Sequence, residues 1–271
     1  TSTKIATVYD NAGTFVTGIN STGMSVTSGS GTFTVTFTTP VATAGSVSKL
    51  TVQSGAHTPI PCADGGDCVI GEVGPGGGNV FYIAAGGFNC GTGYTSTGSP
   101  AGGLCHYLEA APKTWAGGTI DIQKNLLNDA NTNTDVSGIS NETSVNLTTS
   151  GIGLGYKNSL ALVAVVSGTS TAAGTARAYT GGSKSDWYLP TSAELNQMCR
   201  WAKGLSTSDF TVCPSGTINV APAQGFIGDQ YWSSSEYNTS LFWTLHMGFA
   251  GHDPRNKDSV HPYYMRPIRA F

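Results

Sequence analysis

Residues 231–271 have the sequence YWSSSEYNTSLFWTLHMGFAGHDPRNKDSVHPYYMRPIRAF, and the rest of the chain can be organised around them. The two ends of this stretch have the pattern of a scaffold. Tyr231-Trp232 and three serines open it, and residues 265–271 are predicted to close it as a terminal strand. Between these ends, aromatic, small, charged and His residues mix with almost no period. Packed elements need periodic apolar positions, so the middle segment indicates a displayed binding face.

The composition points to an exported, β-rich protein. The 271 residues suffice for one large domain or two ordinary ones. Only 11% of them are charged, against roughly 25% in an average soluble domain, and Gly, Ser, Thr and Asn take their place. The net charge of −3 predicts no nucleic-acid or anionic-membrane partner. No apolar run approaches the roughly 18 residues of a membrane span. No signal peptide is recognisable, so export would rest on a segment absent from this sequence.

The six cysteines favour disulfides over a metal site. Their spacing makes local pairs the economical choice, namely Cys62 with Cys68, Cys90 with Cys105, and Cys199 with Cys213. Each bridge would contribute about 2–3 kcal/mol by closing a loop. A zinc site is disfavoured because there is no C-x-x-C pair and no His at a ligand spacing. Disulfides indicate an oxidising compartment, so we expect an extracellular location, on a cell or virion surface, and no cofactor.

The first 58 residues differ in composition from the rest. Apolar residues alternate with Thr or Ser, which is the period of half-buried strands, in the segments 6–9, 14–17, 24–26, 32–37 and 49–52. We therefore expect a small all-β module over residues 1–58, of antiparallel strands. Residues 59–68 contain Pro59 and Pro61 and are predicted to be a linker. The main domain is then expected over residues 69–271.

Two motifs that could bind small ligands fail on spacing. The glycines of Gly74–Gly78 lead into an apolar strand, whereas a phosphate-binding loop needs a helix N-terminus there. Asp129–Asp135 alternates oxygen-bearing side chains as calcium loops do. However, Thr134 stands where such a loop has glycine, and Ser140 stands where it has glutamate. An ordinary Asn/Asp-rich turn is therefore the preferred interpretation of this segment.

Helical patterns are confined to residues 156–202. Residues 156–166 are apolar on nearly every side, which predicts a buried helix, and the Ala-rich segment 171–179 is a candidate extension of this helical region. Thr191 and Glu194 form a capping box directly after Pro190. Apolar residues then recur at helical spacing and predict one buried face, formed by Leu195, Met198, Trp201 and Ala202.

Three ordered motifs resemble the C-type-lectin-like domain at the C-terminus of bacterial collagen-like adhesins. They are Asp186–Pro190 followed by Glu194-Leu195, then Tyr231–Glu236, then Arg266–Phe271. Residues 74–83 and 106–112, both predicted strands, also resemble the start of such domains. The resemblance covers about residues 69–271. It implies an α+β, C-type-lectin-like fold with two helices, a small central antiparallel sheet, and N- and C-terminal strands side by side.

The tail also resembles the variable proteins of diversity-generating retroelements. In those proteins a C-terminal segment between Tyr-Trp-Ser-Ser and Arg-Pro-Val-Arg-Ala-Phe flanks is randomised by substitution at template adenines. Trp, Met, Lys, Glu and Gln cannot arise from Asn-type codons by that route. Between Tyr237 and Tyr264 only Trp243, Met247 and Lys257 fall outside the accessible set. The resemblance therefore implies that residues 231–271 are a variable region with a fixed frame.

Catalysis and calcium-dependent sugar binding are disfavoured. Formylglycine-generating enzymes share the lectin-like fold but need a reactive cysteine pair, whereas a structural bridge explains Cys199 and Cys213. The five histidines lack a carboxylate at a spacing that would fix a base, and no Gly-x-Ser-x-Gly elbow occurs. The Glu-Pro-Asn, Gln-Pro-Asp and Trp-Asn-Asp motifs of calcium-dependent lectins are absent. We expect no enzyme and no metal site, while sugar binding through stacked aromatics stays open.

The expected function is binding of a protein or glycan ligand on another cell or virus. The residue types that supply contact area and adaptable hydrogen bonds are Tyr237, Asn238, Leu241, Phe242, Thr244, His246, His252, Asp253, Arg255, His261 and Tyr263. For Phe242 and Tyr263 the alternative is a position in the core. Trp243 and Phe249 are expected in the core. If the set is exposed, replacing Tyr237, Phe242 and His252 together abolishes binding and changes stability by less than about 1 kcal/mol.

Two function classes remain open. The first is a receptor or adhesin diversified by a retroelement. The second is a fixed adhesin or a pilin-like subunit of a surface filament, in which residues 1–58 would serve as the assembly module of a homo-oligomer. A near-repeat of the tail's coding sequence beside a reverse transcriptase gene would decide between them.

Overall fold

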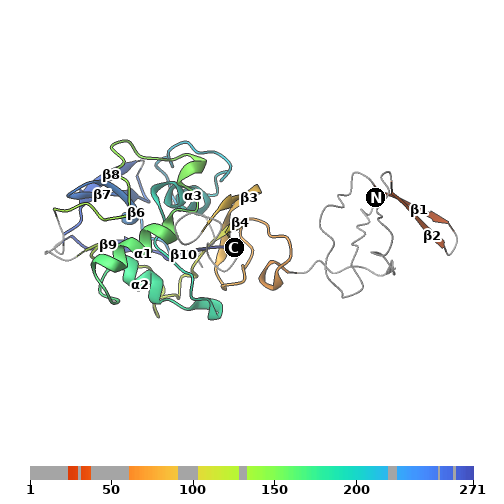
Figure 1. The fold of residues 1–271 in the computed structure, drawn as a ribbon, viewed down its shortest axis with the longest axis horizontal. Helices are drawn as coiled ribbons and strands as arrows, with labels where there is room; N and C mark the ends of the chain where they lie inside the picture. The colour runs from red at the N-terminus through yellow and green to blue at the C-terminus, as the bar shows by residue number, and fades with distance from the viewer. Residues whose placement is uncertain are drawn as a thin grey trace. The chain divides into compact units, whose positions relative to one another are not determined.

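The structure, a computed structural model, describes residues 24–29, 32–37, 61–90, 103–127, 133–218, 225–249, 251–258 and 261–271. It divides the chain into two units, Thr1–Thr58 and Pro59–Phe271 (Figure 1). In the first unit, β1 (Met24–Gly29) and β2 (Thr32–Phe37) form an antiparallel hairpin. The strands predicted over 24–26 and 32–37 are thus present. Those predicted over 6–9, 14–17 and 49–52 lie outside the described residues.

The second unit contains two sheets. The three-stranded sheet has the order β10-β4-β3, and the five-stranded sheet has the order β5-β9-β6-β7-β8. Neighbouring strands are antiparallel except β6 and β9, which meet in parallel at Tyr231 and Tyr264. The strands are β3 (Asn79–Asn89), β4 (Leu104–Ala110), β5 (Ile122–Lys124), β6 (Gln230–Asn238), β7 (Leu241–His246), β8 (His252–Asn256), β9 (Tyr263–Met265) and β10 (Ile268–Ala270).

Three α-helices accompany these sheets in the described residues: α1 (Gly155–Val165), α2 (Ala172–Ala178) and α3 (Ser192–Ala202). Short 3-10 turns form η2 (Cys62–Asp64), η5 (Thr149–Gly151) and η6 (Gly181–Ser183). The predicted capping box is confirmed, because the Thr191 hydroxyl accepts from the Glu194 amide and the Glu194 carboxylate accepts from the Thr191 amide. Every residue of α3 is buried. The predicted core positions Leu195, Met198, Trp201 and Ala202 are therefore confirmed, but the burial extends beyond one apolar face to the polar residues of the helix.

Helix α1 differs from its prediction. Only Gly155, Asn158, Ser159 and Leu162 are buried, so the helix lies at the surface with one face covered. The covered face is partly polar. The Asn158 amide donates to the Ser234 carbonyl at 2.9 Å, and the Ser159 hydroxyl accepts from the Leu189 amide at 2.9 Å. These hydrogen bonds orient the helix against β6 and the segment around Leu189. A pattern of apolar residues in the sequence gives no sign of them.

Two apolar clusters lie around the five-stranded sheet. One joins the three-stranded sheet, α3 and the β6–β7 pair, and includes Phe81, Leu108, Tyr188, Leu195, Met198, Trp201, Tyr231 and Leu245. The other joins α1 and α2 to β6, β7 and β9, and includes Leu162, Leu189, Trp232, Phe242 and Met265. The five-stranded sheet is thus covered on both faces over β6 and β7.

Buried ion pairs join β4, β10 and the segment that precedes α3. Glu109 on β4 accepts from Arg269 Nη1 at 3.0 Å and from the Gly76 and Gly78 amides at 2.9 and 3.1 Å. The glycine turn therefore binds a carboxylate of its own chain. A Cβ at Gly76 would stand 2.6 Å from the Glu109 carboxylate, so this close approach requires glycine. Arg269 Nε also donates to Asp186 Oδ1 at 2.7 Å.

The three predicted disulfides are present, with S–S distances of 2.06, 1.95 and 2.03 Å for Cys62–Cys68, Cys90–Cys105 and Cys199–Cys213. The first bridge packs against Val80 in a small third cluster. Residues 61–68, which were predicted to be a linker, therefore belong to the packed second unit.

The unit is α+β, as predicted, but it differs from the arrangement that the resemblance implies. There are three α-helices in the described residues instead of two, and they accompany two sheets. The C-terminal strand pairs with β4, which separates it from β3. The predicted terminal strand is split into β9 and β10, because Pro267 has no N–H to donate to a ladder. No described helix is long and apolar enough to cross a membrane.

Candidate ligand-binding face

The two ends of the tail form a buried frame, which we define as residues 231–236 and 266–270. Every residue of the frame is buried. The Tyr231 hydroxyl donates to Asp121 Oδ2 at 2.6 Å, and Arg266 Nε donates to Asp121 Oδ1 at 2.6 Å. Desolvation raises the pKa of Asp121, while the Arg266 charge and these hydrogen bonds oppose that rise. The frame is therefore fixed by a buried ion pair and its hydrogen bonds as well as by packing.

Lys257 lies in the middle segment but belongs structurally to the frame. Its side chain is fully buried, and Nζ donates to Glu236 Oε1 at 2.8 Å and to the Thr134 carbonyl at 2.6 Å. Glu236 in turn accepts from the Val136 amide at 3.0 Å. This pair holds the chain after β8 against the end of β6.

Four of the predicted ligand-binding residues come together at the surface. Leu241, Arg255, His261 and Tyr263 line a shallow, open hollow of about 170 Å³ together with Pro254 and Asn256. We call this space the hollow. Strands β7 and β8 supply Leu241, Pro254, Arg255 and Asn256. Strand β9 supplies Tyr263, and the segment just before it supplies His261. The Tyr263 ring is held edge-on against Trp232, with ring centroids 4.9 Å apart.

The remaining predicted residues lie elsewhere, and two are wrong as surface positions. Phe242 and Thr244 are fully buried, because β7 is flanked by β6 and β8 and covered on both faces. The Asn238 side chain accepts from the Ser240 and Leu241 amides and so shapes the β6–β7 turn. Tyr237 packs edge-on against Trp243. Asp253 is exposed beside Arg255, while His252 is turned inward.

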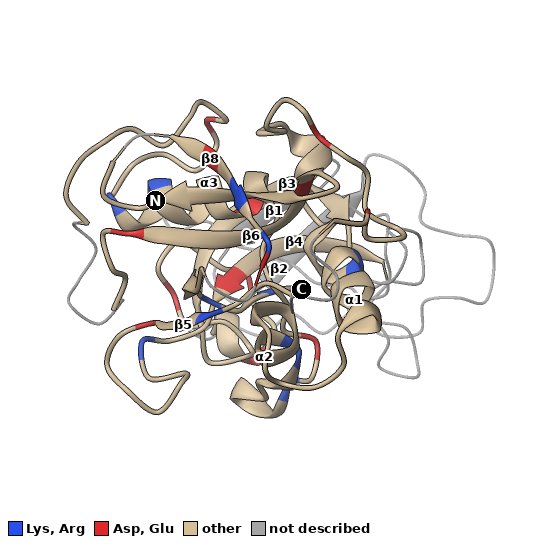
Figure 2. Ribbon diagram, turned by 90° about the vertical axis from the view of Figure 1, so that its left-hand side faces the viewer, with Lys and Arg blue, Asp and Glu red and all other residues tan. Residues whose placement is uncertain are grey.

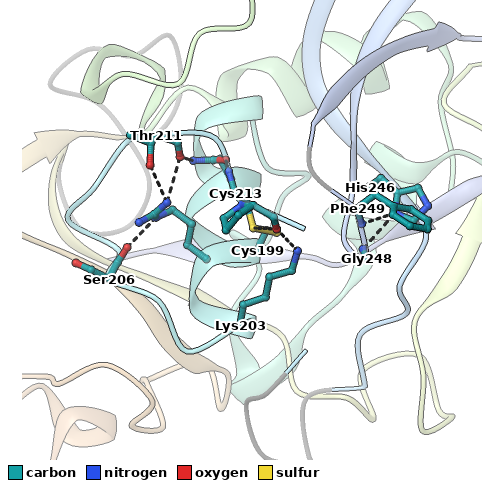
Figure 3. The surroundings of a disulfide bond; sticks show 11 residues. Cys199, Lys203, Ser206, Thr211, Cys213, His246, Gly248 and Phe249 are labelled. Carbon is teal, nitrogen blue, oxygen red and sulfur yellow. Dashed lines mark hydrogen bonds between the residues drawn. A yellow bond between two sulfur atoms is a disulfide. The ribbon is translucent and has the colours of Figure 1, made fainter. Parts of the chain in front are cut away.

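The hairpin tip between β7 and β8 corrects another expectation. Phe249 was predicted to be core, yet it is 67% exposed. His246 explains its position, since its Nδ1 accepts from the Gly248 and Phe249 amides, both at 3.1 Å (Figure 3). The flanking glycines at 248 and 251 are the turn signal that could have placed Phe249 outside the core. Trp243, in contrast, is buried as expected.

Sequence reasoning also missed Pro254 and Asn256 as lining residues. They flank Arg255 on β8, and Arg255 lines the hollow as well, so the period of two of a strand gives no signal for them. Two pairs of ionisable side chains lie at the hollow, Arg255 with Asp253 at 3.3 Å and His261 with Asp258 at 2.8 Å, and all four side chains are at least partly exposed. Exposed pairs of this kind contribute at most about 1 kcal/mol. The face is therefore polar but not held rigidly by its own charges.

The comparisons with known proteins leave the chain without an assigned family. No protein-family model matches it, and no curated protein matches it either. It is similar to a solved structure, a fimbrial protein from Bacteroides ovatus ATCC 8483, with a TM-score of 0.42 and 15% sequence identity. The match covers 84% of this chain and 47% of that one, so the chain spans just under half of that protein. A TM-score this low carries no weight for fold or function.

The described residues also bear on metal binding. Among them, no group of three or more His, Cys, Asp or Glu is arranged to hold a metal ion. Residues 129–132 of the segment weighed as a calcium loop lie outside the described part.

His252 gives the unit an expected dependence on pH. Both ring nitrogens are shielded from solvent and have no hydrogen-bond partner among the described residues. Desolvation lowers the imidazole pKa from 6.5 to about 4, more than the nearby Ser192 backbone and Asp253 raise it. Between these values the unfolded chain binds a proton that the folded chain does not. Stability should therefore fall as pH decreases from about 6.5 to about 4, by about 3 kcal/mol in all.

The measurement must distinguish the contribution of His252 to the pH dependence of stability from that of Glu194. Desolvation raises the Glu194 pKa from 4.5 to about 7, so this group loses stability as pH rises and opposes the His252 trend. Urea unfolding of the native chain and of His252→Asn at pH 4.5 and 7.5 isolates the histidine. The native chain should lose more stability on acidification than the variant does. Parallel pH profiles for the two proteins would contradict the prediction.

Proposed function

We propose that this chain is a surface-displayed binding protein of the receptor or adhesin class, built on a lectin-like α+β unit. The ligand-binding face is the side of the β7–β8 hairpin that carries the hollow. The observation that supports this most is the contrast within one tail. A frame of buried, hydrogen-bonded residues carries a neighbouring group of aromatic, His, Arg and amide side chains that open to solvent. Rigid scaffolds that display adaptable side chains are typical of recognition proteins.

The three disulfides support an oxidising location outside the cell. The low charge content is also visible in Figure 2, where acidic and basic positions are thinly scattered over the ribbon. Strong electrostatic steering is therefore not part of the proposal, and recognition relies on contact area and hydrogen bonds. The function proposed is binding rather than catalysis.

Diversification of the face is the finer part of the proposal. The three residues outside the set accessible to template mutation, Trp243, Met247 and Lys257, are all buried. This agrees with a fixed core beneath a replaceable surface. A tail repeat next to a reverse transcriptase gene, differing only at template adenines, would support it. A locus without that repeat leaves a fixed adhesin or a filament subunit.

Blocking the hollow tests the binding face directly. Asn256 lines the hollow and is exposed, so Asn256→Trp should fill it and change stability by less than about 0.5 kcal/mol. Binding to ligands found on arrays of surface glycans and proteins should fall at least about tenfold, or about 1.4 kcal/mol. Asp67→Trp, on the exposed Cys62–Cys68 loop, is the matched control. If both variants bind ligand equally well, the hollow is not part of the ligand-binding face.

A further inference from the structure

The hollow contains a cation whose hydrogen-bonding capacity is largely unused. Arg255 has a side chain that is 43% exposed, and its Nη2 donates to Asp253 Oδ2 at 3.3 Å. Among the described residues its Nε is shielded from solvent without a partner, and Nη2 rather than Nη1 makes the hydrogen bond to Asp253. We propose that the hollow binds a carboxylate group of the ligand through the guanidinium of Arg255. This inference rests on the proposed function and names the chemistry that the face recognises.

The geometry of arginine favours this ligand. A guanidinium presents parallel N–H groups that match the two oxygens of a carboxylate, which a lysine ammonium cannot do. The Asp253 contact is long and involves one nitrogen only. It therefore leaves the end formed by Nη1 and Nη2 for a second carboxylate.

Neighbouring side chains add donors around the same space. His261 Nδ1 pairs with Asp258 Oδ1 at 2.8 Å, which orients the imidazole beside the hollow. The Asn256 amide lines the hollow as well, and so does Tyr263, whose ring is fixed against Trp232. Asp253 and Asp258 are each engaged by a basic partner, so an entering anion does not meet two free carboxylates.

The size of the hollow limits what accompanies the carboxylate. A volume of about 170 Å³ lies below the roughly 300–1,000 Å³ of sites that enclose drug-sized ligands. The hollow is open, and Leu241 and Pro254 contribute apolar surface to it. It therefore suits one small unit that carries a carboxylate on a compact body. A hexuronic acid residue of a glycan and an acidic amino-acid side chain both meet this description.

Titration of the purified full chain with small probes tests the inference. Glucuronate represents the saccharide source, N-acetyl-aspartate represents the protein source, and glucose is the uncharged counterpart. Backbone amide shifts followed by NMR should report saturable binding of a carboxylate probe, centred on residues 241–263. Glucose should bind at least about tenfold more weakly. The tighter of the two carboxylate probes identifies the source.

Two substitutions of Arg255 distinguish the effect of the paired N–H groups of the guanidinium from the effect of its positive charge. Arg255→Ala should abolish probe binding, and Arg255→Lys should weaken it at least about tenfold although the charge is kept. The inference is overturned if glucose binds as well as glucuronate, if Arg255→Lys binds like the native chain, or if neither carboxylate probe binds. Should Asn256→Trp still block a ligand found on arrays in those cases, the proposed function stands and only the carboxylate inference falls.

Discussion

Lys257→Met is expected to lower the free energy of unfolding by about 3–5 kcal/mol, the usual result of removing one partner of a buried ion pair. The lysine and Glu236 are both fully buried and 2.8 Å apart. Methionine fills a similar volume, so the loss comes from electrostatics more than from a cavity. Glu236 would keep its Val136 amide bond but lose its counter-charge. Its Thr134 neighbour would lose the donor to its carbonyl as well.

The pH dependence of this variant identifies the cause. Desolvation already raises the pKa of Glu236, and the hydrogen bond and charge of Lys257 oppose that rise. Without Lys257 the folded-state pKa rises further. A carboxyl with a raised folded pKa loses stability as pH increases through the window between its unfolded and folded values. The stability difference between the native chain and Lys257→Met should therefore be smaller near pH 4 than near pH 8.

A second substitution and a surface control complete this experiment. Lys257→Met combined with Glu236→Leu should recover much of the lost stability, because no buried charge is then left unpaired. Lys157→Met on α1 changes the same residue type at a partly exposed position and should stay within about 0.5 kcal/mol of the native chain. Urea unfolding followed by circular dichroism measures all three. Equal stability losses at positions 157 and 257 would show that the buried pair contributes nothing.

Local sequence signals predicted local structure well. The capping box of α3 involves residues three positions apart, and the disulfides join cysteines 6, 15 and 14 positions apart. In each case the partners are close in the chain, so spacing alone carries the information. The α+β class followed in the same way from separate strand and helix patterns.

Long-range contacts are what the sequence could not predict. Lys257 would be expected on the surface, yet its partners Glu236 and Thr134 lie 21 and 123 positions away. Phe242 was placed on the binding face because the middle segment has no period. Burial of β7 on both faces removes the period-two pattern that would have marked Phe242 as core. Phe249, in the same middle segment, is exposed because it lies in the turn between β7 and β8 and not in a strand.

Replacement of these two phenylalanines should therefore give opposite results. Phe242→Ala is expected to cost about 3–5 kcal/mol, since a fully buried ring is removed and a cavity is left. The Lys257 ammonium lies 5.4 Å from the Phe242 ring centroid, so the cavity would also disturb the buried ion pair. Phe249→Ala removes an identical side chain that is 67% exposed. Its expected effect is within about 0.5 kcal/mol.

This comparison also decides how binding defects in the tail must be interpreted. Joint replacement of Tyr237, Phe242 and His252 was expected to spare stability, but the burial of Phe242 and of the His252 ring now predicts unfolding. Loss of ligand binding by that triple variant would thus result from unfolding and would not identify binding residues. Thermal unfolding of Phe242→Ala and Phe249→Ala, chosen for identical chemistry, separates the two causes. If Phe249→Ala were the destabilised variant, the division of the tail into a buried frame and a displayed face would be wrong.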